Sequence, residues 1–127
     1  MRPRLCRRVR EVRQGTRGVR TADRAQPGDR FQDRAHGARA HTARTAYYDA
    51  AALMLSGKPF KKQAAIAKLI ASEAAMDNAR DATQIHGGYG FMNEYTVARH
   101  YRDSKILEIG EGTTEVQLML VARELGL

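Results

Sequence analysis

The sequence predicts an all-α fold, and three observations lead to that prediction. Apolar residues between positions 41 and 127 recur at steps of three and four, which is the period of an amphipathic helix. Glycine-containing segments divide this region into four stretches of helical length. No stretch alternates between apolar and polar residues as a half-buried strand does. Because the connections are short, we expect the helices to pack as an antiparallel bundle.

Four helices are expected, and each has a recognisable composition or boundary. They span residues 41–56, 60–86, 94–106 and 114–125. The first ends at Gly57, and the following Lys58-Pro59 disfavours any continuation of the helix. The second is rich in Ala, Lys, Glu and Met, which are good helix formers. Thr114 and Gln117, three residues apart, fit a capping box at the start of the last helix.

Three polar residues interrupt the apolar face of the second helix: Glu73, Asp77 and Arg80. They would either contact another helix or subunit or lie where this face is left uncovered. The sequence leaves both possibilities open.

The first 40 residues differ in composition from the rest of the 127-residue chain. They contain 12 Arg, no Lys and four acidic residues, so they carry the whole net charge of +8. Of the large apolar residues (Val, Ile, Leu, Met, Phe and Tyr), six lie here and 27 lie in residues 41–127. Burial of apolar area must offset about 1–2 kcal/mol of backbone entropy per residue. We therefore expect residues 1–40 to be a disordered or weakly structured basic arm, and residues 41–127 to fold.

Several interpretations of this arm stay open. A nucleic-acid-binding tail would use its Arg residues on phosphates, but Phe31 is its one aromatic residue and it has no base-reading motif. An organellar transit peptide would explain five Arg and no acid in residues 1–10, but not the absence of Ser before Ser56. The arm could also be a plain solvated tail. We favour a wrong reading frame or a misassigned start, because GC-rich codons read out of frame yield Arg, Ala, Gly and Pro.

Composition also excludes several kinds of site. One cysteine, Cys6, permits neither a disulfide framework nor a Cys-based zinc site. His86 has no second ligand at metal spacing, so we expect no metal site. The longest apolar run has six residues, at positions 50–55, whereas a membrane span needs about 20. We therefore expect no membrane crossing.

Two glycine-containing loops could carry chemistry. In residues 84–90, glycines at a helix end allow the backbone of another molecule or a flat ligand to approach closely. In residues 110–114, Glu111 lies between two glycines just before a helix N-terminus, whose amides suit a polar or anionic group. Such a carboxylate can act as a base when bound substrate desolvates it. The spacing alone favours the plainer interpretations, a structural helix stop for residues 84–90 and a loop acid stabilised by the helix dipole for Glu111.

Together these pieces resemble the C-terminal helical domain of the acyl-CoA dehydrogenase family. Residues 64–125 carry the resemblance, with an AKL-x-x-SE helix, a Q-x-x-GGxG loop, an RD-x-K helix and an EGT-x-x-x-Q loop in that order. It extends back to about residue 43 and vanishes upstream, where the family's preceding helix with an Arg-x-x-Phe-Gly flavin contact is expected. The implied fold is an incomplete antiparallel four-helix bundle.

The resemblance also implies an activity and a site. Family members bind FAD and oxidise the Cα–Cβ bond of an acyl-CoA thioester to a trans-2-enoyl-CoA. Glu111 maps onto the base that removes the α-proton, although some members carry the base on the preceding helix. Gly110 and Gly112 border the substrate. The FAD-contacting positions are Gln84, Ile85, His86, Gly87 and Gly88, which face a neighbouring subunit's FAD, together with Thr113 and Glu115.

The remaining implications concern partners and location. Acyl-CoA would be the substrate, the chain would form a homo-oligomer (a dimer or tetramer), and an electron-transfer flavoprotein would be the acceptor. The compartment would be the bacterial cytoplasm, or the mitochondrial matrix in a eukaryote. The family's N-terminal helical and middle β-domains supply most of the flavin and CoA pocket, so we expect this chain alone to be inactive. A non-enzymatic helical oligomerisation module and, with less support, a basic nucleic-acid-binding protein are the alternative functions.

Overall fold

The computed structural model describes residues 27–127, and every regular element in that range is helical. The elements are α2 (Pro27–Leu55), α3 (Lys61–His86), the 3₁₀ turn η2 (Gly87–Phe91), α4 (Thr96–Ser104), α5 (Ile106–Ile109) and α6 (Thr114–Glu124). The predicted all-α class is confirmed. The helices expected over 60–86 and 114–125 match α3 and α6 closely, whereas the one expected over 94–106 is divided into α4 and α5.

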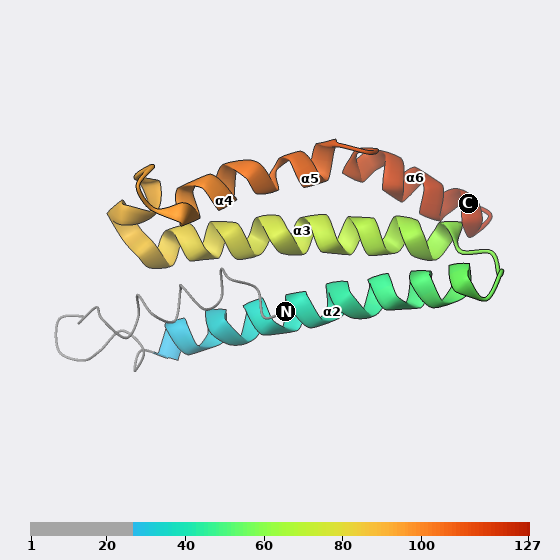
Figure 1. The fold of residues 1–127 in the computed structure, drawn as a ribbon, viewed down its shortest axis with the longest axis horizontal. Coiled ribbons are helices and arrows are strands. Elements are labelled where there is room, and N and C mark those ends of the chain that lie inside the picture. Colours follow the sequence, from blue (N-terminus) through green and yellow to red (C-terminus); the bar gives the residue numbers. More distant parts are fainter. Residues whose placement is uncertain (1–26) are drawn as a thin grey trace.

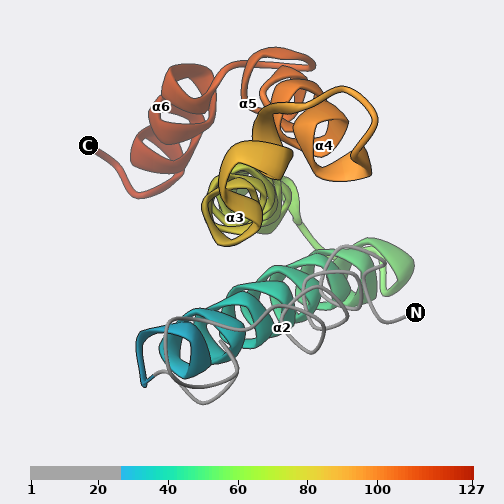
Figure 2. The same cartoon turned by 90° about the vertical axis from the view of Figure 1, so that its left-hand side faces the viewer.

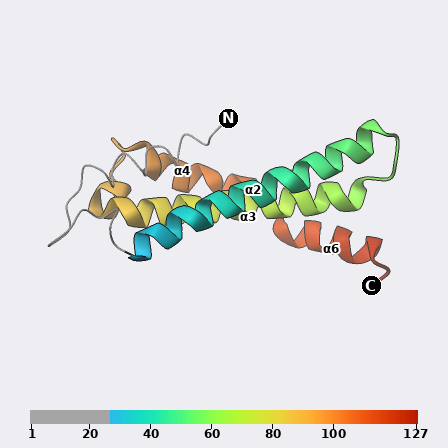
Figure 3. The same ribbon diagram turned by 90° about the horizontal axis from the view of Figure 1, so that it is seen from below.

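Helix α3 is the central rod of the molecule (Figure 1). On one side α2 runs antiparallel to it, and on the other side α4, α5 and α6 return along it in three shorter pieces. Viewed from the end, α3 lies between these two layers (Figure 2). From below, α2 crosses α3 obliquely (Figure 3). This is the predicted antiparallel packing. The segment that returns along α3 is divided into three helices, with breaks before α5 and before α6.

The first helix begins at Pro27, so the expectation that residues 1–40 lack structure is wrong for residues 27–40. Proline suits the first helical position, where a missing N–H costs no hydrogen bond. The prediction failed because it counted large apolar residues. Helix α2 instead packs through small and polar side chains: Ala50 is buried and His36 is 1% exposed. The other end of α2 is as predicted, with Gly57 at a φ of 69° directly after it. Residues 1–26 lie outside the described residues.

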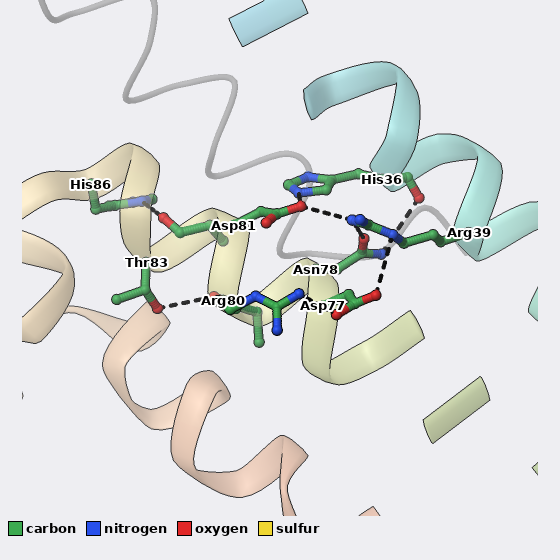
Figure 4. Close-up of polar contacts among 10 residues, drawn as sticks. His36, Arg39, Asp77, Asn78, Arg80, Asp81, Thr83 and His86 are labelled. Carbon is green, nitrogen blue, oxygen red and sulfur yellow. Dashed lines mark hydrogen bonds and ion pairs between the residues drawn. The ribbon is translucent and has the colours of Figure 1, made fainter. Parts of the chain in front are cut away.

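A polar cluster joins α2 to α3 (Figure 4). Arg39 Nη1 lies 2.7 Å from Asp81 Oδ2 and 3.2 Å from Asn78 Oδ1, and Arg39 Nε lies 3.7 Å from Asp77 Oδ2. His36 Nε2 is 3.5 Å from the same Asp81 oxygen. Asp77 therefore does contact another helix, which was one of the two possibilities that the sequence left open.

The inner face of α3 is lined by small residues. Five alanines of this helix are buried: Ala65, Ala67, Ala74, Ala79 and Ala82. On the α4 side, Val97 is buried against Ala82, and Ile85 packs beside them. Many large apolar side chains remain exposed instead, including Leu55 at 83% and Leu125 at 58%. Within residues 27–127, no helix is both long and apolar enough to span a membrane.

Candidate functional site

The loop after α3 turns away sharply and leaves part of its backbone bare. Gly87 ends α3 with a φ of 57° and a ψ of −137°, a conformation open to glycine, and η2 follows at once. Gln84, Gly87 and Gly88 are exposed. A Cβ added at Gly87 or Gly88 would meet nothing within 4 Å, so the space above these glycines is open.

The side chains of Ile85 and His86 point into the protein rather than out of this loop. Ile85 packs against Ala82 and Val97. His86 is 9% exposed, and its Nδ1 lies 2.8 Å from the carbonyl oxygen of Ala82. A carbonyl oxygen can only accept, so Nδ1 carries the proton. The buried His86 can therefore offer a ligand its backbone groups but not its ring, whereas the half-buried Ile85 side chain is packed towards Val97.

Gly90 differs from its two neighbouring glycines in the same loop. It is buried, and a Cβ added there would lie 2.3 Å from the backbone oxygen of Thr83. Here glycine is needed by the fold, because η2 passes directly against the end of α3. Nearby, the Tyr89 and Tyr95 rings lie 5.2 Å apart, and the Tyr95 ring meets His86 edge-on at 6.5 Å.

The second loop, between α5 and α6, holds Glu111 in an unusual backbone conformation. Its φ is 57°, and it is the one non-glycine residue with positive φ in residues 27–127. This region costs an L-residue roughly 1–2 kcal/mol. The Glu111 side chain is exposed, and its carboxylate makes no hydrogen bond or ion pair with the described part of the chain. The carboxylate is thus free to meet a molecule from outside.

Two side chains from different helices hold the backbone of this loop. Lys68 Nζ, on α3, donates to the Gly112 carbonyl oxygen at 2.5 Å. Gln117 Nε2, on α6, donates to the carbonyl oxygens of Glu111 at 3.4 Å and Gly112 at 3.3 Å. Gln117 is 6% exposed. The loop is therefore anchored on both the α3 and the α6 side.

The capping box predicted at Thr114 is wrong by one residue and in its chemistry. Thr113 is the N-cap, and its Oγ1 accepts from the Val116 N–H. The Gln117 amide does reach back, but it donates to loop carbonyls instead of accepting from the cap residue. The residue type at that spacing correctly suggested a contact across the helix start, and only the folded loop shows which groups take part.

Charges around the start of α6 are paired locally. A hydrogen bond from Thr113 holds the pKa of Glu115 below its ordinary value, with a smaller contribution from Lys105. The Lys105 pKa is raised by Glu108, whose Oε2 lies 2.6 Å from Lys105 Nζ. Glu115 is therefore an anion at neutral pH, stabilised by the same residue that caps the helix. Among the side chains of residues 34–127, no three His, Cys, Asp or Glu gather as metal ligands would.

The structure does not bring the two loops together within one chain. Lys68 marks the place where the Glu111 loop meets α3, whereas Gln84 lies at the far end of the same helix. They are 16 positions apart on the helix, which corresponds to about 24 Å at a rise of 1.5 Å per residue. Lys68 lies in the AKL-x-x-SE pattern, which predicts no role for it. Nothing in its local sequence shows that it reaches Gly112, which lies 44 positions away.

Comparisons with known proteins agree with this geometry. The family profile described as "Acyl-CoA dehydrogenase, C-terminal domain" matches residues 18–126. The expectation that the resemblance vanishes upstream of residue 43 is therefore wrong. The short-chain specific acyl-CoA dehydrogenase of Megasphaera elsdenii is 56% identical over 78 residues, which are 61% of this chain and 20% of that protein. The mitochondrial short-chain specific acyl-CoA dehydrogenase of Bos taurus is 50% identical over 84 residues, 66% of this chain and 20% of that protein.

A solved structure shows the same arrangement of helices. The butyryl-CoA dehydrogenase of Megasphaera elsdenii superposes with a TM-score of 0.92 and 38% identity, over 97% of this chain and 32% of that one. The chain thus spans about a fifth of the length of the curated relatives that it matches. Because the profile covers most of its residues, the chain belongs to the acyl-CoA dehydrogenase family and corresponds to its C-terminal domain.

Proposed function

We propose that this chain supplies the catalytic base of an FAD-dependent enzyme that oxidises an acyl-CoA thioester to a trans-2-enoyl-CoA. The observation that carries the proposal is the state of Glu111. Its carboxylate is exposed and unengaged, while the backbone that bears it is held from two helices. A general base needs this combination, because it must be free to accept a proton and fixed in position.

In the proposed step, the Glu111 carboxylate takes the α-proton of the thioester. The electron pair of that C–H bond forms the Cα–Cβ double bond, and the β-hydrogen leaves with its own electron pair. FAD, when bound, supplies the acceptor for this hydride. Gly110 and Gly112, on either side of the base, are proposed to border the substrate. A Cβ added at Gly112 would lie 2.6 Å from Gln117 Nε2, and one at Gly110 would lie 3.2 Å from the Ile106 carbonyl oxygen, so glycine lets the loop pack closely at both positions. Closure of the site by other domains would exclude water from the carboxylate.

The residues proposed to hold the flavin fit a flat ligand. Gly87 and Gly88 offer bare backbone with open space above it, and Gln84 adds an exposed amide. Ile85 and His86 would contribute through their backbone, because their side chains are packed inward. Thr113 and Glu115 are proposed to contact the flavin on the Glu111 side.

The separation of the two loops supports assembly with other copies of the chain. Since about 24 Å of α3 lies between them, residues 84–88 are proposed to meet the flavin of a neighbouring subunit. The exposed apolar side chains fit the same proposal, because large exposed apolar patches usually mark association surfaces. Leu118, Met119 and Leu125 lie exposed on or beside α6. We propose a homo-oligomer, a dimer or tetramer as is typical of the family.

The acceptor and the compartment are proposed from the family. Electrons would pass to an electron-transfer flavoprotein. The relatives named above include a bacterial enzyme and a mitochondrial one, which fits a bacterial cytoplasm or a mitochondrial matrix.

The test uses a chimeric enzyme: the Megasphaera elsdenii short-chain specific acyl-CoA dehydrogenase with residues 43–127 of this chain in place of its corresponding C-terminal residues. Glu111→Gln is nearly isosteric but cannot act as a carboxylate base. We expect it to keep FAD and acyl-CoA binding and to slow flavin reduction by acyl-CoA about 10²–10⁴-fold. Stopped-flow absorbance of the flavin measures this rate.

Glu124→Gln, on the exposed last turn of α6, is the matched control and should reduce flavin at the unsubstituted rate. A Glu111→Gln rate equal to that of the control would place the base elsewhere, for example on the preceding helix. A chimera that folds but holds no FAD would favour the oligomerisation module instead.

A further inference from the structure

The lysine contact on the Glu111 loop is the feature that the proposed function leaves unexplained. Lys68 is partly buried on α3, and its Nζ lies 2.5 Å from the Gly112 carbonyl oxygen. The two residues are 44 positions apart, so this hydrogen bond connects the central helix to the loop. A charged donor makes a stronger hydrogen bond to a carbonyl than a neutral one does.

The position of this charge is unfavourable for the neighbouring helix itself. Helix α6 begins one residue after Thr113, and a helix N-terminus carries a partial positive charge. An ammonium group next to that end repels it, whereas Glu115 in the first turn is the type of charge that favours it. Stabilisation of α6 therefore does not account for Lys68, and the effect of Lys68 falls on the loop.

The loop needs such a restraint at this point. Glu111 has a φ of 57° and Gly112 a φ of 101°. A left-handed glutamate relaxes to a commoner conformation unless its surroundings prevent it. Gln117 contacts the carbonyls of both residues, but at 3.3–3.4 Å these hydrogen bonds are longer than that of Lys68. Lys68 is thus the shortest link that opposes rotation of the Glu111–Gly112 peptide.

We propose that Lys68 is a positioning residue: by holding the Gly112 carbonyl, it fixes the backbone from which the Glu111 carboxylate reaches its substrate. This inference rests on the proposed function of Glu111 as the base. Lys68 touches neither the substrate nor the flavin in this role, and it acts only through the conformation of the loop.

The first experiment measures the loop directly in the complete 127-residue chain. Lys68→Met keeps the length of the side chain and removes the donor. Hydrogen exchange followed by mass spectrometry should show faster exchange in residues 110–117 and unchanged exchange in residues 70–86 of α3. Lys62→Met, on a partly buried lysine of the same helix with no hydrogen bond or ion pair among the described residues, is the control.

The second experiment measures the consequence for catalysis in the chimeric enzyme. A base displaced by about 1 Å loses up to 100-fold in rate, so we expect Lys68→Met to lower kcat about 10–100-fold. KM and the flavin absorbance spectrum should stay unchanged. Lys68→Arg should recover most of kcat, because its guanidinium can still donate to the carbonyl. If Lys68 had a purely structural role, Lys68→Met would change protein stability and flavin content, and it would not lower kcat while leaving KM unchanged.

Three outcomes would overturn the inference: Lys68→Met indistinguishable from Lys62→Met in both experiments, a uniform rise of exchange along the chain, or no recovery of kcat with Lys68→Arg. The proposed function is tested separately, by Glu111→Gln. If Glu111→Gln abolishes flavin reduction while Lys68→Met leaves kcat unchanged, Glu111 is the base and Lys68 does not position it. If Glu111→Gln has no effect, the proposed function itself is wrong.

Discussion

The two glycine-containing loops look alike in sequence and differ in how they are built. Residues 84–90 are held by neighbours close in sequence: His86 contacts Ala82, and Gly90 passes against Thr83. Residues 110–113 are held by Lys68, far away in sequence, and their backbone is strained at Glu111. A compact turn needs only local contacts, whereas a strained residue needs support from elsewhere in the fold. This difference indicates that residues 110–113, and not residues 84–90, form the loop that is shaped around one side chain, that of Glu111.

The largest effect on stability is expected at Gly90. A methyl group there must displace the Thr83 backbone oxygen, so Gly90→Ala should lower the free energy of unfolding by about 1–3 kcal/mol. Gly88→Ala is the matched control in the same loop, and open space around it should leave stability unchanged. Thermal unfolding of the 127-residue chain without flavin measures both. Equal losses of stability would contradict the distinction between Gly90, which the fold requires, and Gly88, which is open to a ligand.

A smaller effect of opposite sign is expected in the other loop. Glu111→Gly removes the Cβ that makes the left-handed conformation costly, so it should raise the free energy of unfolding by up to about 1 kcal/mol. Glu124→Gly, in the helical backbone of α6, should lower it instead, because glycine is a poor helix residue. The same thermal unfolding experiment compares the two. A destabilised Glu111→Gly variant would mean that the loop stores no strain.

The smallest effect concerns how the thermal stability contributed by Glu115, in the first turn of α6, depends on pH. The pKa of Glu115 is lowered in the folded chain, so its stabilisation is present above the ordinary value of 4.5 and is lost as the pH falls through the folded-state pKa. The Tm difference between the unsubstituted protein and Glu115→Gln should therefore shrink on acidification. Because Glu115 is fully exposed, the difference should also shrink with added salt. A Tm difference that does not change with pH would show that the effect of Glu115→Gln does not come from the charge of Glu115.

The parts of the fold that sequence reasoning predicted are those set by local signals. The stop at Gly57, the length of α3 and the start of α6 each depend on residues within one or two turns. The beginning of α2 was missed because its packing depends on Arg39 and His36 meeting Asp81, which lies more than 40 positions away. Periodicity of apolar residues carries no information about such a polar interface.

The candidate site divides in the same way. The residue types at Glu111 and in residues 84–88 could be identified from motifs. The positive φ of Glu111 could not, because glutamate rarely adopts it and the reason lies in contacts from other helices. The inward orientation of Ile85 was missed for a related reason: it depends on Val97, contributed by α4. The His86 ring lies instead against the Ala82 carbonyl oxygen and the Tyr95 ring.

The alanine-lined inner face of α3 has a consequence for how this domain can change in evolution. Ala79 and Ala82 are 0% exposed, so a larger side chain at either position would push a neighbouring helix away. The outward-facing apolar side chains are under no such constraint from this chain itself, and what covers them decides which replacements are accepted. We expect the buried alanine positions of α3 to vary little among related sequences. The exposed apolar positions should vary more, together with the surfaces that cover them.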